Sequence, residues 1–365
     1  ARVIQGIGAS ACMANNQGII TETFPASKRG KALGITGTFV ALGSLTGPPL
    51  GGFLTHISSW QYIFLINIPV GAITLVLALK ILPTEKRKKV VKIDWSGAIL
   101  FAMSIVPLFY VLTNWESTAV NNIEMVLLIL LALCSFIIFI IVEKRNREPL
   151  LHLELFKSRL FSISILSAFI SFVSIFCAII IMPFYLQDVK GLTPAGAGVI
   201  MMAYPIILAF TAPLSGYISD KIGSEIITFI GLTITSAGLF IMASLTETST
   251  TTALILSIAV MSFGNGMFQS PNNSLVMSQA PKNKLGIAGS INSLIRNLGM
   301  VFGVSFSTTL LYDRMSYKIG YKVTNYVANR SDIFIYGMKV VFITAGFLSL
   351  FGALLTALRM IEAGK

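Results

Sequence analysis

Two arginines stand inside long apolar stretches, where each supplies a permanent positive charge and several hydrogen-bond donors. Arg2 opens the first apolar run, and Arg296 lies near the middle of the run 285–312. A charged side chain within a membrane span is costly, so it usually faces a partner or a watery cavity. Asn292 lies four residues before Arg296 and shares its helix face. Both arginines are candidates for contact with a charged ligand or a proton. A snorkelling Arg2 and an Arg296 tied to neighbouring carbonyls are the alternatives.

Amides, methionines and aromatic side chains gather in several other apolar runs. Met adapts its shape to irregular partners, and aromatic faces attract cations. Such a cluster is typical of a cavity for small molecules, although ordinary packing explains any single member as well. Together with Asn292 and Arg296, the candidates for lining a cavity are Asn15, Asn16, Tyr185, Met201, Tyr204, Asn265, Phe268, Gln269 and Asn272.

The stretch 42–54, LGSLTGPPLGGFL, places helix-breaking residues inside an apolar run. Glycines at every fourth position make a smooth helix stripe, which lets two backbones approach closely in a membrane. The adjacent prolines free carbonyl groups and bend the helix. The spacing alone favours ordinary small-residue packing over a role in gating. The positions of interest are Gly43, Gly47, Pro48, Gly51 and Gly52.

A second pattern, GYISDKIG at 216–223, contains Gly216, Asp220, Lys221 and Gly223. Asp220 can cap a helix or pair across one face of the protein. Ser224 and Glu225 follow where a run of basic residues would strengthen such a pairing, so a structural latch is favoured over a charge relay.

Several kinds of chemistry have no support in the sequence. Cys12, Cys134 and Cys177 lie in apolar runs without metal or redox spacing, and His56 and His152 are isolated. No nucleophile, metal cluster or phosphate-binding loop indicates an enzyme, a cofactor or a metal site. All 15 acidic residues fall at span ends or in loops. A carboxylate that could couple transport to protons is therefore expected outside this sequence.

Composition indicates an integral helical membrane protein. The 365 residues are 55% hydrophobic and 12% charged, against about 25% charged in soluble domains. Apolar segments long enough to span a bilayer number 11. They cover 1–24, 31–55, 60–82, 94–114, 123–142, 160–187, 192–218, 224–245, 252–279, 285–312 and 334–359.

The net charge of +12 is explained by topology rather than by nucleic acid. When loops alternate between the two sides, 19 basic residues fall on one side and 6 on the other. The positive-inside bias makes the first side cytoplasmic. Two basic connections, 83–93 and 143–159, bracket a separate pair of spans.

Several motifs together resemble the major facilitator drug:proton antiporters of the 14-span branch. Arg2, Gln5, Gly6 and Gly8 match the R-x-x-Q-G-x-G pattern of their fourth span, and 43–52 matches the antiporter motif of the fifth. The segment 182–198 resembles the opening of their second half, 216–223 resembles that half's echo of a cytoplasmic loop motif, and 291–299 resembles their thirteenth span. The pair 94–142 corresponds to the two helices inserted between the halves.

The resemblance implies an all-α polytopic membrane protein with the major facilitator fold, holding 11 of 14 spans. Residues 1–82 would be the remainder of the N-terminal bundle, 83–159 the linkers and inserted pair, and 160–365 the C-terminal six-helix bundle. We expect a monomer in the bacterial plasma membrane, and we expect the chain to be a fragment that cannot transport alone.

The implied function is export of drugs or other amphipathic molecules by proton antiport through alternating access. Arg2 would assist proton transfer, and the glycine helix would seal the seam between the halves. Two alternatives stay open: an exporter of anionic or endogenous metabolites such as fatty acids, and a truncated membrane protein that does not transport. The expected partners are protons, a small amphipathic substrate and the lipid bilayer, without nucleic acid.

Overall fold

The structure is a computed structural model that describes residues 2–25, 28–29, 31–40, 42–43, 46, 61–82, 94–114, 122–146, 149–281 and 284–363. Every regular element in these ranges is helical. The first elements are α1 (Arg2–Thr23), a helical segment at 31–40, α3 (Tyr62–Leu65), α4 (Asn67–Ile81), α5 (Trp95–Asn114) and α6 (Asn122–Arg145). A short 3₁₀ helix, η2 (Leu153–Lys157), precedes the remaining elements. They are α7 (Arg159–Phe184), the π-helical turn η3 (Tyr185–Val189), α8 (Pro194–Met201), α9 (Ala203–Ile222), α10 (Ser224–Ala243), α11 (Thr251–Ser278), α12 (Leu285–Ile319) and α13 (Ser331–Ala363).

The predicted fold class is confirmed, because each of the 11 predicted spans contains helical residues in the part of the chain that the structure describes. Eight helical stretches there are long and apolar enough to cross a bilayer by themselves. They run from Trp95–Leu112 to Ser331–Arg359, and α4 is a shorter apolar helix.

Local sequence signals fix where several helices begin and end. Ser158, Thr193 and Thr250 each accept a backbone N–H of the first turn, at the starts of α7, α8 and α11. Gly223 ends α9 with a φ of 99°, and Gly320 ends α12 with a φ of 90°. These backbone angles favour glycine because it has no side chain to clash.

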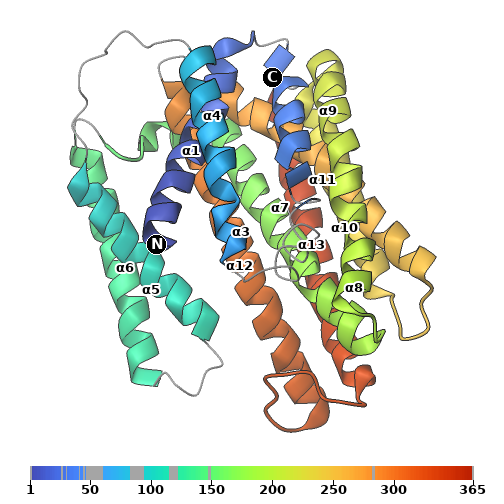
Figure 1. Cartoon of the computed structure of the whole chain (residues 1–365). Coiled ribbons are helices and arrows are strands. Elements are labelled where there is room, and N and C mark those ends of the chain that lie inside the picture. Colours follow the sequence, from blue (N-terminus) through green and yellow to red (C-terminus); the bar gives the residue numbers. More distant parts are fainter. Residues whose placement is uncertain are drawn as a thin grey trace.

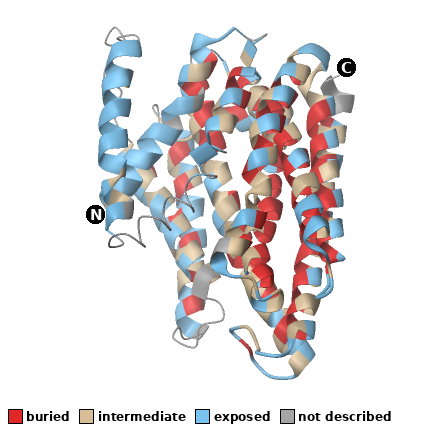
Figure 2. Ribbon diagram, turned by 45° about the vertical axis from the view of Figure 1, so that its right-hand side comes forward, coloured by how far each residue is buried: buried red, intermediate tan, exposed pale blue. Residues whose placement is uncertain are grey.

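Burial is uneven between the two parts of the molecule. Buried residues gather in α7 and α9–α13, whereas the helices of the first 145 residues are largely exposed (Figure 2). In α4 no residue is buried, although it is strongly apolar. Apolar surface of this extent is typical of contact with lipid rather than water.

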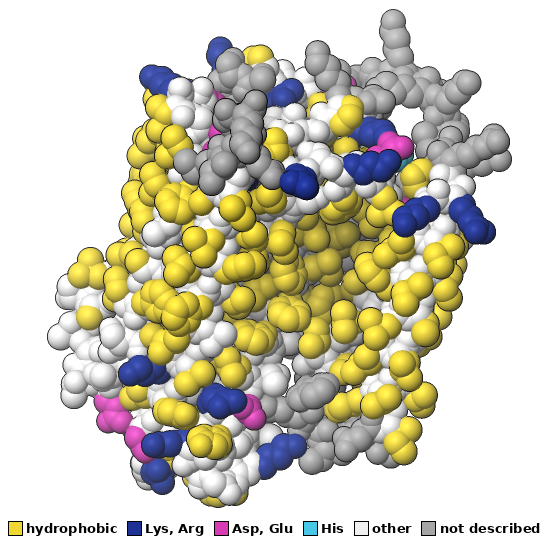
Figure 3. Space-filling view, turned by 180° about the vertical axis from the view of Figure 1, so that it is seen from behind, with side chains coloured by type: hydrophobic (Ala, Val, Ile, Leu, Met, Phe, Trp, Pro, Cys, Tyr) yellow, Lys and Arg dark blue, Asp and Glu magenta, His cyan; other side chains and the backbone are white. Residues whose placement is uncertain are grey.

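On one face of the molecule the charged side chains gather at two levels, as expected for a protein that crosses a bilayer (Figure 3). Figure 3 shows lysine and arginine near the two ends of the molecule, with a largely hydrophobic surface between them. The same view is hollowed at its middle, and hydrophobic side chains line the hollow. The helix pair α5–α6, predicted to be an insertion, lies to one side of the other helices (Figure 1).

The C-terminal bundle is held together by close helix contacts at glycine. A Cβ on Gly231 of α10 would lie 2.6 Å from the backbone nitrogen of Phe268 on α11. One on Gly238 would lie 2.5 Å from the backbone nitrogen of Met261. No side chain fits between these backbones, so α10 and α11 approach as closely as helices can.

We predict that Gly231→Ala lowers the free energy of unfolding by about 1–3 kcal/mol, because the added methyl group must push α10 away from α11. The measurement is thermal unfolding of the purified protein in detergent. Gly71→Ala in α4 is the matched control, since a Cβ there would meet nothing within 4 Å. Equal unfolding temperatures for the two variants would contradict the close contact.

Candidate functional site

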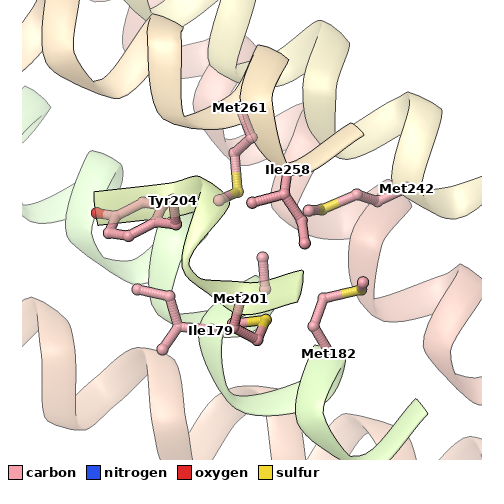
Figure 4. A pocket seen from close by; sticks show the side chains of 8 residues that line it. Ile179, Met182, Met201, Tyr204, Met242, Ile258 and Met261 are labelled. Carbon is pink, nitrogen blue, oxygen red and sulfur yellow. The ribbon is translucent and has the colours of Figure 1, made fainter. Parts of the chain in front are cut away.

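A cluster of methionines lies where α7, α8, α10 and α11 meet. Met182, Met201, Met242 and Met261 surround a gap of about 10 Å³, with Tyr204 of α9 at its side (Figure 4). That volume is room for about one water molecule. The predicted candidates Met201 and Tyr204 are thus brought together, in a packed state that leaves no room for a drug-sized ligand.

Tyr204 connects this cluster to a polar residue of α11. Asn265 Nδ2 donates to the Tyr204 hydroxyl at 2.7 Å, and Ser262 Oγ donates to the Tyr204 carbonyl at 2.6 Å. The Oδ1 atom of Asn265 is buried and has no donor among the described residues. This amide therefore retains a free acceptor beside the methionine cluster.

Asn272, further along α11, belongs to a different polar cluster at the other end of the bundle. It donates to the Ser164 carbonyl of α7 at 3.2 Å. Arg359 of α13 donates to Ser164 Oγ at 2.9 Å, to Asn272 Oδ1 at 3.5 Å and to Thr228 Oγ1 of α10. Arg359 is only 1% exposed, and no described carboxylate forms an ion pair with it. The arginine joins four helices through neutral acceptors.

The remaining predicted candidates of the C-terminal half lie in several environments. Tyr185 is buried and donates to the Thr246 carbonyl at 2.6 Å. Phe268 is buried against Leu232 and Ala353. Gln269 is half-buried on α11. These positions are not gathered around one cavity, and their proposed contact with a substrate stays a prediction.

Arg296 and Asn292 share a face of α12, as their spacing predicts. Asn292 is buried and donates to Asn273 Oδ1 of α11 at 2.7 Å. Arg296 is half-buried, and no hydrogen bond or ion pair of its side chain is found within the described residues. A role at a cavity requires a charged side chain that is not tied to neighbouring groups, and Arg296 meets this condition among the described residues.

A wide cavity lies between α5 and the outer half of α12. Its volume is about 620 Å³, within the range of small-molecule sites. Phe302 and Phe306 stack with ring centroids 6.1 Å apart. The hydroxyl of Ser305 is buried without a partner among the described residues. The lining residues are Leu112, Phe302, Ser305, Phe306, Thr309, Leu310, Asp313, Ser316 and Lys322.

None of the predicted cavity residues lines this space. The sequence feature that corresponds to this cavity is a repeat on α12, in which Phe302 and Phe306 alternate with Ser305 and Thr309. The repeat predicts a cavity only once α5 is known to lie beside α12, and the sequence does not specify the position of α5 and α6.

The N-terminal candidates lie on α1. Asn15 and Asn16 are exposed, and Asn15 donates to the Ala11 carbonyl of its own helix at 2.9 Å. Arg2 is the first residue of α1, and its side chain lies outside the described part. Its predicted role is therefore untested.

The two parts of the chain meet at α1 and the start of α12, on the side that the basic residues predict to be cytoplasmic. A Cβ on Gly18 of α1 would lie 3.0 Å from the backbone of Gly286 on α12. Ser293 Oγ of α12 also donates to the Met13 carbonyl of α1 at 3.0 Å. These contacts join the start of α12 to the end of α1.

A second contact joins the helical segment 31–40 to α9. A Cβ on Gly34 would lie 2.5 Å from Pro213 Cα, and Thr38 Oγ1 donates to the Ala209 carbonyl at 2.9 Å. At Gly43 a Cβ would meet nothing within 4 Å. Gly47, Pro48, Gly51 and Gly52 lie outside the described residues. Within the described part, the close contact between the segment 31–40 and α9 therefore lies at Gly34 and Thr38. These residues come about one to two helix turns before Gly43, where the motif predicted to form the contact begins.

Asp220 joins α9 to the start of the segment 31–40. Its Oδ2 accepts the backbone N–H of Lys31 at 3.2 Å, where the segment 31–40 begins. The charge lies at the positive end of that helix, where a carboxylate is stabilising. Lys221 lies over the Tyr217 ring, 4.4 Å from its centroid. Gly216 is buried within α9, and Gly223 ends that helix.

Comparison with known proteins identifies the family. Residues 1–304 match the Major Facilitator Superfamily. The chain belongs to the major facilitator superfamily. As a facilitator, it is a multi-pass transporter of the bacterial plasma membrane, and the coarse expectation from the sequence is confirmed.

Relatives of this facilitator include transporters with named substrates. The riboflavin transporter RibZ of Clostridioides difficile is 32% identical over 88% of this chain and 69% of its own length. Multidrug resistance protein 3 of Bacillus subtilis is 30% identical over 85% of this chain and 60% of its own length. A bacterial homologue of the iron transporter ferroportin, at 16% identity and a TM-score of 0.40, covers 96% of this chain and 87% of its own.

Two polar features of the facilitator were missed by the sequence analysis. Arg359 was counted among the cytoplasmic basic residues, and the structure buries it inside the C-terminal bundle. On α7, Ser164, Ser167, Ser171 and Ser174 recur on one buried helix face. The serine spacing was visible in the sequence, whereas the partners of Arg359 come from three helices distant in the chain.

We predict that Asp220→Asn speeds hydrogen exchange of the amides at the start of 31–40 by about two- to fivefold, because an exposed helix-end charge contributes about 0.3–1 kcal/mol. Hydrogen–deuterium exchange with mass spectrometry measures this. Asp188→Asn, at the opposite side, should leave these amides unchanged. Exchange that is the same in both variants would exclude Asp220 as the fastening group.

We also predict that Arg359→Ala lowers the free energy of unfolding of the facilitator by about 2–5 kcal/mol, since it leaves a cavity and polar groups without partners. Arg330→Ala is the control. Arg330 pairs with Asp332 at an exposed site, so its loss should cost at most about 1 kcal/mol. Thermal unfolding in detergent compares the two, and a similar small loss in both would disprove the structural role of Arg359.

Proposed function

We propose that this facilitator exports amphipathic small molecules of the multidrug class in exchange for protons, as a member of the 14-span branch. The helices α1 to α13 would take the places of spans four to fourteen in that branch. Relatives named as multidrug proteins in Bacillus subtilis and Mycobacterium tuberculosis, at 25–30% identity, support this class.

The observation that carries the proposal is the cavity between α5 and α12. One side of it is aromatic, at Phe302 and Phe306, and a polar strip of Ser305, Thr309 and Asp313 runs beside the rings. Such a surface suits a molecule with an apolar body and a polar or charged end. The lining includes both Asp313 and Lys322, so it favours neither sign of charge strongly.

The position of the contacts between the two parts supports alternating access. Gly18, Ser293, Gly34 and Asp220 all make their contacts in the cytoplasmic half, whereas the cavity lies beside the outer half of α12. Such an arrangement is expected of a carrier that is closed toward the cytoplasm. Export would then require opening the seam at 31–40 and α9 and closing the outer side.

A second candidate function is transport of riboflavin or a similar aromatic metabolite. The relative with 32% identity is named a riboflavin transporter. An aromatic wall would accept a planar ring by stacking. This candidate falls within the endogenous metabolites that the sequence left open as an alternative.

The test is uptake by inside-out vesicles that contain the full-length protein and carry an acidic interior. We expect ethidium to accumulate, and the accumulation to fall when the proton gradient is collapsed. Phe306→Ala should reduce uptake about tenfold, whereas Phe351→Ala, on an exposed face of α13, should not change it.

Arg2→Ala in the same assay should abolish the dependence on the proton gradient. Riboflavin uptake without ethidium uptake would replace the multidrug assignment with the second candidate.

Equal transport by the Phe306→Ala and Phe351→Ala variants would show that the cavity is not on the substrate path. The absence of any uptake by folded protein would refute the antiporter.

A further inference from the structure

Two carboxyl groups meet at the cytoplasmic end of the inserted helix pair. Asp94 directly precedes α5, and Glu143 lies in the last turn of α6. Only 3% of Glu143 is exposed. Burial of a charged carboxylate is costly unless donors or a cation compensate it. The partners of each oxygen atom therefore indicate which form of the two groups is present.

Asp94 has the surroundings of an ionised carboxylate. Its Oδ1 atom accepts Ser96 Oγ–H at 2.6 Å and the Gly97 backbone N–H at 2.9 Å. The hydrogen bond from Ser96, followed by that from Gly97, holds the pKa of Asp94 below its usual value. The N-terminal end of α5 favours the same negative charge.

Glu143 uses one oxygen to hold the connection that follows α6. Its Oε1 atom accepts the backbone N–H of Leu151. The other oxygen, Oε2, is buried and has no donor among the described residues. The same is true of Asp94 Oδ2. Each carboxyl thus has one oxygen with donors and one without.

The two oxygens without donors face the same small space. A Cβ placed on Gly97 would lie 2.5 Å from Asp94 Oδ2 and 2.9 Å from Glu143 Oε2. Two ionised carboxylates that face one small space repel, and groups that share a site in this way commonly hold one proton between them. A single proton would supply the missing donor for both oxygens.

Among the described residues, no charged group replaces that proton. Helix α5 has no charged residue between Trp95 and Asn114. Lys144 and Arg145 on α6 are exposed, and Glu154 of η2 is paired with Lys284 at 2.8 Å. No ion pair joins either carboxyl to a cation in the described ranges. The other charged groups of the neighbouring elements are His152, Lys157 and Arg159 around η2, and Arg296, Asp313, Arg314 and Lys318 on α12, which touches α5.

We propose that Asp94 and Glu143 form a proton-binding site, in which Glu143 Oε2 holds the proton and donates it to Asp94 Oδ2. The proton comes from cytoplasmic water and returns to it, so no other reactant is involved. The site lies away from the contacts between the two halves and from the α5–α12 cavity. It is separate from the proton coupling proposed above.

The bound proton fastens the inserted pair to the C-terminal bundle. Leu151, held by Glu143, packs against the hydrophobic cluster of Leu155, Phe161 and Leu285 at the cytoplasmic end of α7 and α12. When the proton leaves, two adjacent negative charges push the start of α5 away from the end of α6. Glu143 moves with the end of α6 and carries Leu151 on its other oxygen, so this displacement loosens the connection at 149–157 when the cytoplasmic pH rises.

The test is infrared difference spectroscopy of the full-length protein in lipid, following the carboxylic acid C=O band as the pH is raised. We expect one protonated carboxyl at neutral pH that is lost at alkaline pH. Glu143→Gln should lack this band, and Glu154→Gln, an exposed control on η2, should retain it. A wild-type spectrum identical to that of Glu143→Gln would overturn the proposal.

Asp94→Asn distinguishes a pair from a lone buried carboxyl, and it also serves if Glu143→Gln fails to fold. Without the negative charge of Asp94, the band should disappear at a lower pH than in the wild type. An unchanged titration would overturn the pair. A metal-binding site would also overturn the proposal. In that case the band would be missing, and Na⁺, Mg²⁺ or Ca²⁺ would raise the unfolding temperature of the wild type but not that of Glu143→Gln.

The fastening role has its own readout in hydrogen exchange of residues 149–157. Glu143→Gln keeps a donor toward Asp94 and an acceptor for Leu151, so it resembles the protonated form. At alkaline pH we expect exchange in the wild type to be several-fold faster than in Glu143→Gln at the same pH, and the two to be equal at neutral pH. A ratio that does not change with pH would contradict the fastening role.

Discussion

Close approach of helix backbones at glycine is the constraint on which the rest of this structure depends. In a bilayer no hydrophobic force drives one apolar helix onto another, so contact at short range must supply the attraction. Gly231 and Gly238 bring α10 against α11, Gly303 brings α12 against α7, and Gly34 brings the segment 31–40 against α9. The first three contacts build the C-terminal bundle, and the last holds the two parts of the chain together.

The short distances allow hydroxyl groups to reach the backbone of a neighbouring helix. Ser215 donates to the Gly266 carbonyl at 2.7 Å, and Ser236 donates to the Gly346 carbonyl at 2.8 Å. Ser349 closes a third contact, to the Leu232 carbonyl at 3.0 Å. In each case a hydroxyl that would be costly in lipid is satisfied by a carbonyl of the neighbouring helix. The glycines and serines therefore act together, since the hydrogen bonds require the spacing that the glycines permit.

Much of the fold follows from the sequence, because span length and the positions of basic residues are set by the bilayer. The predicted run 160–187 became α7 with its π turn, and 224–245 became α10 with boundaries nearly unchanged. Asp220 was expected to cap a helix or pair across the protein face, and it lies at the start of the segment 31–40. These features depend on local pattern or on a short motif.

The site was harder to predict, because it depends on which helices become neighbours. Asn265 and Asn272 look equivalent on α11, yet one binds Tyr204 and the other belongs to the cluster around Arg359. Arg359 looked like a terminal cytoplasmic charge because its partners are Ser164, Thr228 and Asn272, all far away in sequence. Glu143 looked like a solvated residue at a span end, and only the position of Asp94 and Leu151 reveals its burial.

Helix α12 is longer than the membrane that it crosses. Its 35 residues span about 52 Å, whereas the hydrocarbon core is about 30 Å thick. The surplus lies mostly on the outer side, where Asp313, Arg314 and Lys318 follow the aromatic wall in one unbroken helix. Because the helix is unbroken, a change in its tilt at one end displaces the other end in proportion to its length. About 50 Å of helix separates Gly286 from Ile319, so a tilt of about 10° at the level of Gly286 would move the far end by roughly 9 Å. Small rearrangements where α12 contacts α1 would thus cause large displacements of the outer end of α12.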